Sequence, residues 1–146
     1  MIRNLVLITL LLLVNTINSQ TQIRKGSKSY GDILYNWDGN NLRVGSTSYG
    51  AIIINWDGRY IRQGSKSYGK ILYNWDGQFL RIGSTSYGHI AVNWDGRYIR
   101  RGSKEYNDEL YNWDGINLRI GSKPYGEILY NIEGSIPIAI LIYIIY

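Results

Sequence analysis

The chain has 146 residues, a formal net charge of +5 and no cysteine. Its length indicates one domain, and the lack of cysteine excludes a disulfide framework, thiol chemistry and the lipidated cysteine of a bacterial lipoprotein. Lysine and arginine alternate with acidic residues along the chain. That pattern is typical of a solvated surface, so we expect no nucleic-acid partner.

Residues 1–19 have the features of a secretory signal peptide. Arg3 supplies the positive n-region, an apolar h-region covers residues 5–14, and a polar segment ends at Ser19. We expect cleavage between Ser19 and Gln20 and export to the periplasm, the cell surface or the medium. The alternative is an N-terminal membrane anchor, but the apolar core is about half of the ~20 residues that a span needs.

A 19-residue unit fills residues 20–134 and recurs six times without insertion. Trp-Asp-Gly occurs in five copies and becomes Ile-Glu-Gly at residues 132–134 in the sixth. Residues 21–27 already carry the end of a unit, with Arg24 in the recurring arginine slot. The Gly-Ser pairs that mark each copy begin at Gly26, Gly45, Gly64, Gly83, Gly102 and Gly121. A fixed short period predicts a repeat architecture.

Each unit contains two short runs rich in Ile, Leu, Tyr and Val, typified by residues 30–36 and 40–46. Such runs between turn residues predict strands, and the Asp-Gly pair that joins them is a strong hairpin signal. Side chains alternate between the two faces of a strand. We therefore expect the Leu42 slot to face the core, the Asp32 slot to face water, and the Arg43 slot to lie on the wetter face. Gly31 should permit a close approach of two backbones.

One hairpin cannot stabilise itself, so the six must share a core. We expect an all-β fold in which six hairpins form a closed, flower-like ring or a stacked array, with no helix except the signal peptide. Residues 135–146 are almost wholly apolar, which predicts a C-terminal strand that packs on the repeat domain and is buried on both faces.

A third possibility is a small outer-membrane barrel or an oligomeric pore that the apolar tail nucleates. We do not favour membrane association, because the repeat strands span ~7 residues and lack the lipid-facing alternation over ~9–11 residues that such barrels show.

Short Gly-x-Ile, Asp-Gly and Ile-Arg elements, as in residues 50–65, are followed by a closing Gly-Ser-Ile-Pro and an aromatic apolar tail in residues 134–146. Together with the leader, they resemble the 4-fold beta-flower family of small exported proteins of the Bacteroidetes type. The resemblance covers nearly the whole chain after residue 19 and implies a closed, petal-like all-β fold of unknown biochemical role. The chain differs from that pattern in its six units and in the tryptophan of its turns.

We expect no enzymatic activity, no cofactor and no metal site. His89 is the only histidine and occupies a slot that varies among the copies, and most hydroxyl groups recur from copy to copy. One carboxylate per turn is too few for calcium, which takes about 6–8 oxygen ligands. We therefore assign a turn-forming role to the Asp-Gly pairs Asp38, Gly39, Asp57, Gly58, Asp76, Gly77, Asp95, Gly96, Asp114 and Gly115.

The recurring tryptophan and arginine are the best candidates for binding a ligand, because indole rings can lie against sugar faces and repeated weak sites gain avidity. The candidates are Trp37, Trp56, Trp75, Trp94, Trp113, Arg43, Arg62, Arg81, Arg100 and Arg119. The alternative is that each tryptophan packs on a neighbouring turn while arginine stacks on it or pairs with aspartate.

The sequence thus favours a non-enzymatic exported repeat protein that acts as a structural or surface-interaction module. The second hypothesis is a multivalent carbohydrate-binding module. A glycan or another cell-surface component is the expected partner.

Overall fold

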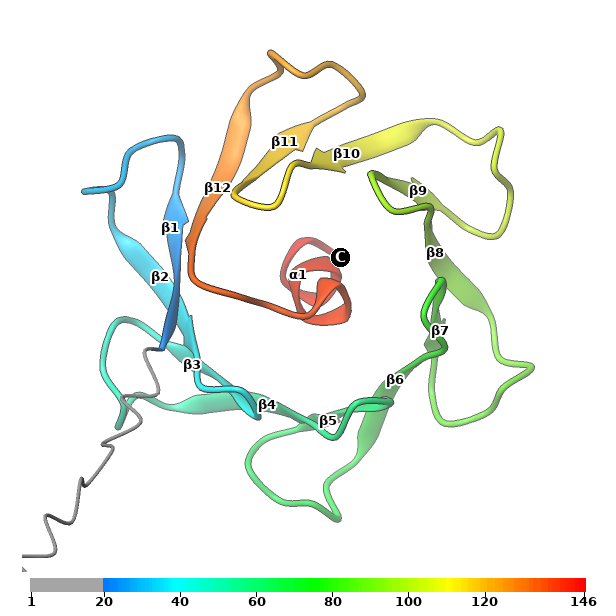
Figure 1. Cartoon of the computed structure of the whole chain (residues 1–146). Helices are drawn as coiled ribbons and strands as arrows, with labels where there is room; N and C mark the ends of the chain where they lie inside the picture. The colour runs from blue at the N-terminus through cyan, green and yellow to red at the C-terminus, as the bar shows by residue number, and fades with distance from the viewer. Residues whose placement is uncertain (1–19) are drawn as a thin grey trace, which may run out of the picture.

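The computed structural model describes residues 20–146, which form twelve antiparallel strands in a closed barrel around one short helix (Figure 1). The elements are β1 (Thr21–Lys25), β2 (Ile33–Trp37), β3 (Asn41–Val44), β4 (Ile52–Trp56), β5 (Tyr60–Gln63), β6 (Ile71–Trp75), β7 (Phe79–Ile82), β8 (Ile90–Trp94), β9 (Tyr98–Arg101), β10 (Glu109–Trp113), β11 (Asn117–Ile120), β12 (Ile128–Glu133) and α1 (Ile138–Ile145). The expected signal peptide, residues 1–19, lies outside the described residues.

The strands pair in chain order as six hairpins, beginning with β1–β2 and ending with β11–β12. The loops inside these hairpins point outward from the ring, and the Trp-Asp-Gly turns join one hairpin to the next (Figure 1). We call the outward loops petal loops; they comprise residues 26–31, 45–50, 64–69, 83–88, 102–107 and 121–126. The all-β fold of six hairpins is confirmed, and of the two expected arrangements the chain adopts the closed one.

The two ends of the repeat domain close the ring. Strand β1 pairs with both β2 and β12, so that Ile23 lies opposite Ile132. The Gly26 N–H donates to the Leu129 carbonyl at 2.9 Å, just as the Gly45 N–H donates to the Leu34 carbonyl at 2.8 Å. The β1–β12 joint therefore has the same hydrogen bond as the β2–β3 pair, which a turn joins covalently, and the barrel has no free strand edge.

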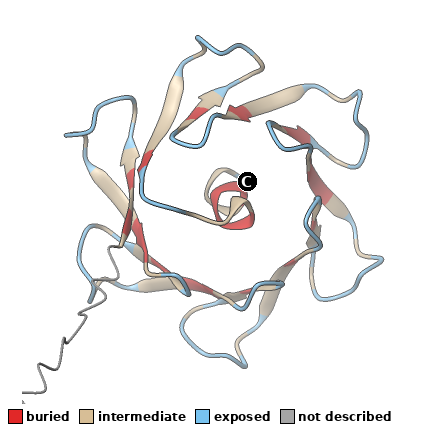
Figure 2. Ribbon diagram, in the orientation of Figure 1, coloured by how far each residue is buried: buried red, intermediate tan, exposed pale blue. Residues whose placement is uncertain are grey.

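The core lies between the inner face of the strands and helix α1 (Figure 2). The Leu42 slot faces this core as expected, and its six side chains are at most 1% exposed: Ile23, Leu42, Ile61, Leu80, Ile99 and Leu118. The Asp32 slot is exposed in every copy, also as expected. A Cβ atom on Gly31 would come within 2.8 Å of the Lys25 carbonyl oxygen, which confirms the close approach of two backbones.

The C-terminal segment is a helix, so the expectation of a buried strand at residues 135–146, with no helix except the signal peptide, is wrong. Residues Ala139, Ile140, Leu141 and Ile142 are buried inside the ring. A closed barrel offers no edge with which a thirteenth strand could pair, and the apolar lumen leaves peptide groups without partners. A helix bonds its own N–H and C=O groups, and one that is apolar on all sides can be buried on all sides.

Pro137 starts this helix in an extended conformation, and its carbonyl accepts the Ile140 and Leu141 N–H groups at 3.0 and 3.2 Å. Across residues 20–146, no helix combines the length and the apolarity that a membrane crossing requires.

Candidate functional sites

The Trp-Asp-Gly turns are built around the aspartate side chain. Asp38 Oδ1 accepts the backbone N–H groups of Asn40 and Asn41 at 2.9 and 2.7 Å. Gly39 takes φ = 99°, a conformation that favours glycine. The same pair of bonds is made by Asp57, Asp76, Asp95 and Asp114. The structure thus places the Asp-Gly pairs at the turns.

The second carboxylate oxygen of each aspartate receives the recurring arginine. Arg43 lies 3.0 Å from Asp38 Oδ2 and also donates through Nε to the Ser48 carbonyl at 2.9 Å. Equivalent pairs are Asp57–Arg62, Asp76–Arg81, Asp95–Arg100 and Asp114–Arg119. In the sixth copy Arg24 pairs with Glu133 at 3.2 Å and joins the two ends of the domain. The arginine side chains are only 8–15% exposed. The Arg43 slot, which we expected on the wetter face of the strand, is therefore largely shielded from water.

These contacts change the acidity of the turn carboxylates. Burial of the carboxyl group raises the pKa of Asp114, but hydrogen bonds from Arg119 and from the backbone of Asn117 and Ile116 outweigh it and lower the pKa to about 2. The same opposing causes lower the pKa of each of the other four: Asp38, Asp57, Asp76 and Asp95. The ionised carboxylates are therefore part of the folded structure.

The five tryptophans pack against the core. Trp37 is only 4% exposed, and the other four are half-buried against core side chains. Three of the arginines stack instead on the aromatic residue that follows the turn: Arg62 on Tyr60, Arg81 on Phe79 and Arg100 on Tyr98, at 5.1–5.2 Å from the ring centres. The candidate Trp–Arg series is thus already engaged within the protein.

Shallow hollows nevertheless lie between neighbouring turns. One of about 580 Å³ is lined by Trp94, Arg97, Trp113 and Arg119, among others. Another of about 600 Å³ is lined by residues that include Arg59, Trp75 and Arg81. Each offers part of an indole ring beside a guanidinium group.

The recurring asparagine has a role that the sequence analysis missed. Asn36 Nδ2 donates to the carbonyls of Gly45 and Thr47 at 2.7 and 3.1 Å, which fixes the base of the next petal loop. Asn131 instead donates to Asn117 Oδ1 at 3.0 Å. The same clamp recurs at Asn55, Asn74, Asn93 and Asn112. Its regular spacing ten positions after each Gly-Ser was the available signal.

The petal loops carry the most exposed aromatic side chains among the described residues. Their tyrosines are 79–88% exposed: Tyr30, Tyr49, Tyr68, Tyr87, Tyr106 and Tyr125. Each follows a Gly-Ser pair and either lysine or threonine. Gly, Ser and Tyr together are typical of loops that recognise other molecules, because tyrosine offers a large contact area at a low cost in conformational entropy.

His89 is exposed and lies at the base of the fourth petal loop. Within residues 20–146, no three side chains of His, Asp or Glu gather in a way that could hold a metal ion.

A family model described as "6-fold beta flower protein" matches residues 23–141 of the chain. The comparisons with curated proteins and with solved structures found no match. The family match confirms the beta-flower type that the sequence resembles and corrects its symmetry from four-fold to six-fold, in agreement with the six hairpins.

Proposed function

The chain belongs to the 6-fold beta flower proteins, and we propose that it is a non-enzymatic, exported module that attaches to a surface through its six petal loops. The observation that carries this proposal is the set of six petal-loop tyrosines, each 79–88% exposed at the tip of a nearly identical loop. Equivalent sites on one body favour a partner that is itself repeated, such as a surface glycan, since binding at one loop raises the effective concentration at the next.

The scaffold beneath the loops supports this role. Five of the six loops are held at their base by a buried asparagine, and the ring is filled by helix α1. Loops fixed in this way lose little further conformational freedom when they bind. Most hydroxyl groups recur among the units, and this supports a binding role over catalysis, which needs a unique constellation of groups.

The test is a microarray of immobilised glycans at two densities, probed with the labelled protein. We expect wild-type protein to bind at least one glycan, more tightly at the higher density, and a variant with all six petal tyrosines changed to serine to lose that binding. Unchanged binding by the serine variant would show that the petal loops do not bind the glycan. Hydrolysis of a glycan that one Ser, Asp or Glu substitution abolishes would make the protein an enzyme.

The second candidate is a carbohydrate-binding module that uses the hollows between the turns, with Trp94 and Trp113 or Trp75 as the platform. This candidate predicts that the serine variant still binds a glycan and that its tryptophan emission shifts when the glycan is added. Binding with no change in tryptophan emission would count against this candidate and in favour of the petal loops.

A further inference from the structure

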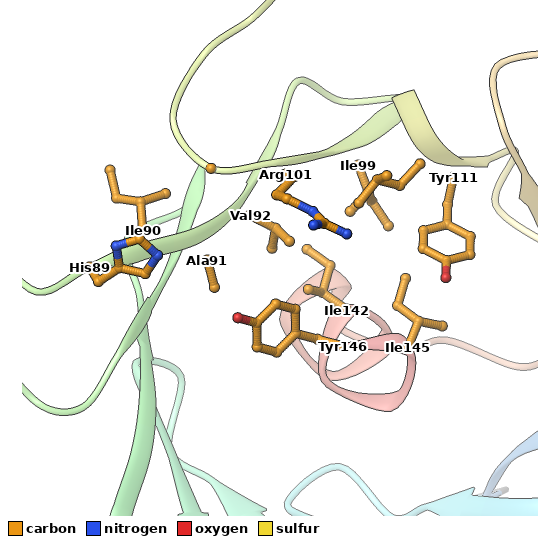
Figure 3. Close-up of a pocket in the computed structure, with 12 residues that line it drawn as sticks. His89, Ile90, Ala91, Val92, Ile99, Arg101, Tyr111, Ile142, Ile145 and Tyr146 are labelled. Carbon is orange, nitrogen blue, oxygen red and sulfur yellow. The ribbon is translucent and has the colours of Figure 1, made fainter. Parts of the chain in front are cut away.

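A cavity of about 640 Å³ lies inside the ring, between helix α1 and strands β8, β9 and β10 (Figure 3). Its walls are mostly aliphatic and include Ala91, Val92, Ile99, Leu110, Ile142 and Ile145. Its size falls within the range of about 300–1,000 Å³ that is usual for small-molecule sites.

The cavity occurs where one repeat departs from the others. The fourth copy has Ala91 and Val92 in the two positions that hold Leu or Ile and then Tyr or Ile elsewhere. In the third copy, Tyr73 contacts Tyr143 and Tyr146 of the helix edge to face, at 6.1 and 5.9 Å between ring centres. Val92 has no ring with which to bridge to the helix, and Ala91 lacks most of a leucine side chain.

A cationic side chain lies over this apolar space. Arg101 is opposite Val92 in the sheet, and its guanidinium group points toward Ile142 (Figure 3). The six arginines of the recurring slot all form ion pairs, whereas Arg101 has no acidic group within ion-pair distance among residues 20–146. Asp108 borders a neighbouring hollow that Arg101 also lines.

Other polar groups at the cavity are the His89 imidazole and the hydroxyl groups of Tyr111 and Tyr146 (Figure 3). An imidazole N–H and a phenol O–H can both donate hydrogen bonds. The cavity therefore combines an apolar interior with donors and one positive charge at its edge.

We propose that this cavity binds an amphipathic carboxylate. The aliphatic tail occupies the space beside Ala91 and Val92, against Ile142 and Ile145 of the helix. The carboxylate accepts hydrogen bonds from the Arg101 guanidinium, whose planar fork matches two carboxylate oxygens. This site is distinct from the petal-loop tyrosines and does not depend on the proposed surface attachment.

The experiment measures binding of octanoate to the full chain by isothermal titration calorimetry, with octanol and octyltrimethylammonium as probes that have the same tail and a different head. Two variants separate the tail and head contacts. Ala91→Leu with Val92→Tyr fills the cavity with residues that other copies carry, and Arg101→Gln introduces the residue found at the equivalent Gln63. Arg97→Gln is the matched control, because it also removes one positive charge and places the residue found at the equivalent Gln78.

We expect octanoate to bind more tightly than either of the other probes. Arg101→Gln should weaken octanoate binding roughly tenfold and leave octanol binding unchanged, since a hydrogen bond to a charged group accounts for that factor. The filled variant should bind none of the probes while it unfolds at a temperature no lower than wild type, and Arg97→Gln should bind octanoate as tightly as wild type. Equal or tighter binding of octanol or octyltrimethylammonium, or undiminished octanoate binding by the filled variant, would overturn the proposal.

Discussion

At the scale of single residues, the recurring asparagine illustrates how a polar side chain on a strand can hold a neighbouring loop in place. Asn93 is 1% exposed, and its amide joins the carbonyls of Gly102 and Lys104 at 2.7 and 3.3 Å. Because side chains alternate along the strand, Asn93 is expected on the outer face of the barrel. It is buried because the petal loop of residues 102–107 folds over it. No pattern of residues in one strand reveals that a neighbouring loop will fold over it.

We expect Asn93→Ala to lower the free energy of unfolding by about 1–3 kcal/mol, because it leaves two carbonyl groups at the base of the loop without their donor. Asn131→Ala is the control. Asn131 is half-buried and donates only to Asn117, so its loss should cost less. Urea denaturation of both variants checks this, and equal losses would contradict a clamping role for Asn93.

The turn aspartates should make the stability depend on pH. A carboxyl group whose pKa is lower in the folded chain stabilises the fold above its unfolded pKa, and this contribution disappears as the pH falls through the folded pKa. For Asp114 the pKa is 3.8 in the unfolded chain and about 2 in the folded chain. We expect the free energy of unfolding to be constant from about pH 7 to pH 5 and to fall from about pH 5 to pH 2.

Asp114→Asn keeps the Oδ1 acceptor of the turn and removes the charge that pairs with Arg119. The loss of stability between pH 5 and pH 2 should therefore be smaller in this variant than in wild type. Urea denaturation at a series of pH values provides the measurement. A wild-type unfolding free energy that stays level down to pH 2 would show that the turn carboxylates contribute nothing as ions.

The aromatic residues show how far the sequence alone could identify the candidate sites. Tryptophan and tyrosine both recur in the units, and from the sequence tryptophan is the predicted ligand-binding residue. In the structure Trp37 and Tyr35 both pack against the core, whereas Tyr49 lies in a petal loop with 88% of its surface exposed. Exposure depends on which of the two turns projects from the ring, and that follows from ring closure rather than from either turn sequence.

At the scale of elements, the hairpins could be predicted and the tail could not. The tight turn between β2 and β3 is encoded locally, because Gly39 and the Asp38 side chain fix it within five residues. Residues 138–145 are apolar on every side and carry no period that separates a helix from a strand. Their conformation is decided by the lumen, which provides apolar contacts and no strand edge.

Helix α1 should contribute strongly to stability as the filling of the ring. Ile140 is fully buried, so Ile140→Ala should lower the free energy of unfolding by about 2–5 kcal/mol. Tyr146→Ala is the control at the end of the helix, where 57% of the side chain is exposed, and its effect should be clearly smaller. Thermal or urea denaturation compares the two; similar effects would mean that the segment does not fill the lumen.

At the scale of the whole molecule, the ring depends on a joint without a covalent turn. Strand β1 and strand β12 are held by the apolar pair Ile23–Ile132, by the ion pair Arg24–Glu133, and by a hydrogen bond of 2.5 Å from Thr21 Oγ1 to the Ser135 carbonyl. Ile23 is fully buried, whereas the Glu133 side chain is 67% exposed. The apolar contact should therefore dominate the closure.

Substitutions at this joint test that ranking. Ile23→Ala should lower the free energy of unfolding by about 2–5 kcal/mol, whereas Glu133→Gln should lower it by less than about 1 kcal/mol. Ile61→Ala is the matched control for Ile23, because Ile61 occupies the equivalent slot where a Trp-Asp-Gly turn joins β4 to β5 covalently. Urea denaturation measures all three, and a larger loss for Glu133→Gln than for Ile23→Ala would show that the ion pair holds the ring closed.

We propose that six equivalent petal loops act together on a repeated partner. The measurement that tests it most directly is the dissociation rate from a dense layer of a glycan that binds wild-type protein. It compares wild type with variants that carry Tyr→Ser at one, three or six petal loops. We expect dissociation to accelerate more than in proportion to the tyrosines removed, because each lost contact also lowers the chance of rebinding by the others. If one substitution raises the dissociation rate as much as six do, the protein binds through a single unique site. If the dissociation rate stays at the wild-type value in all variants, attachment through the petal loops is contradicted.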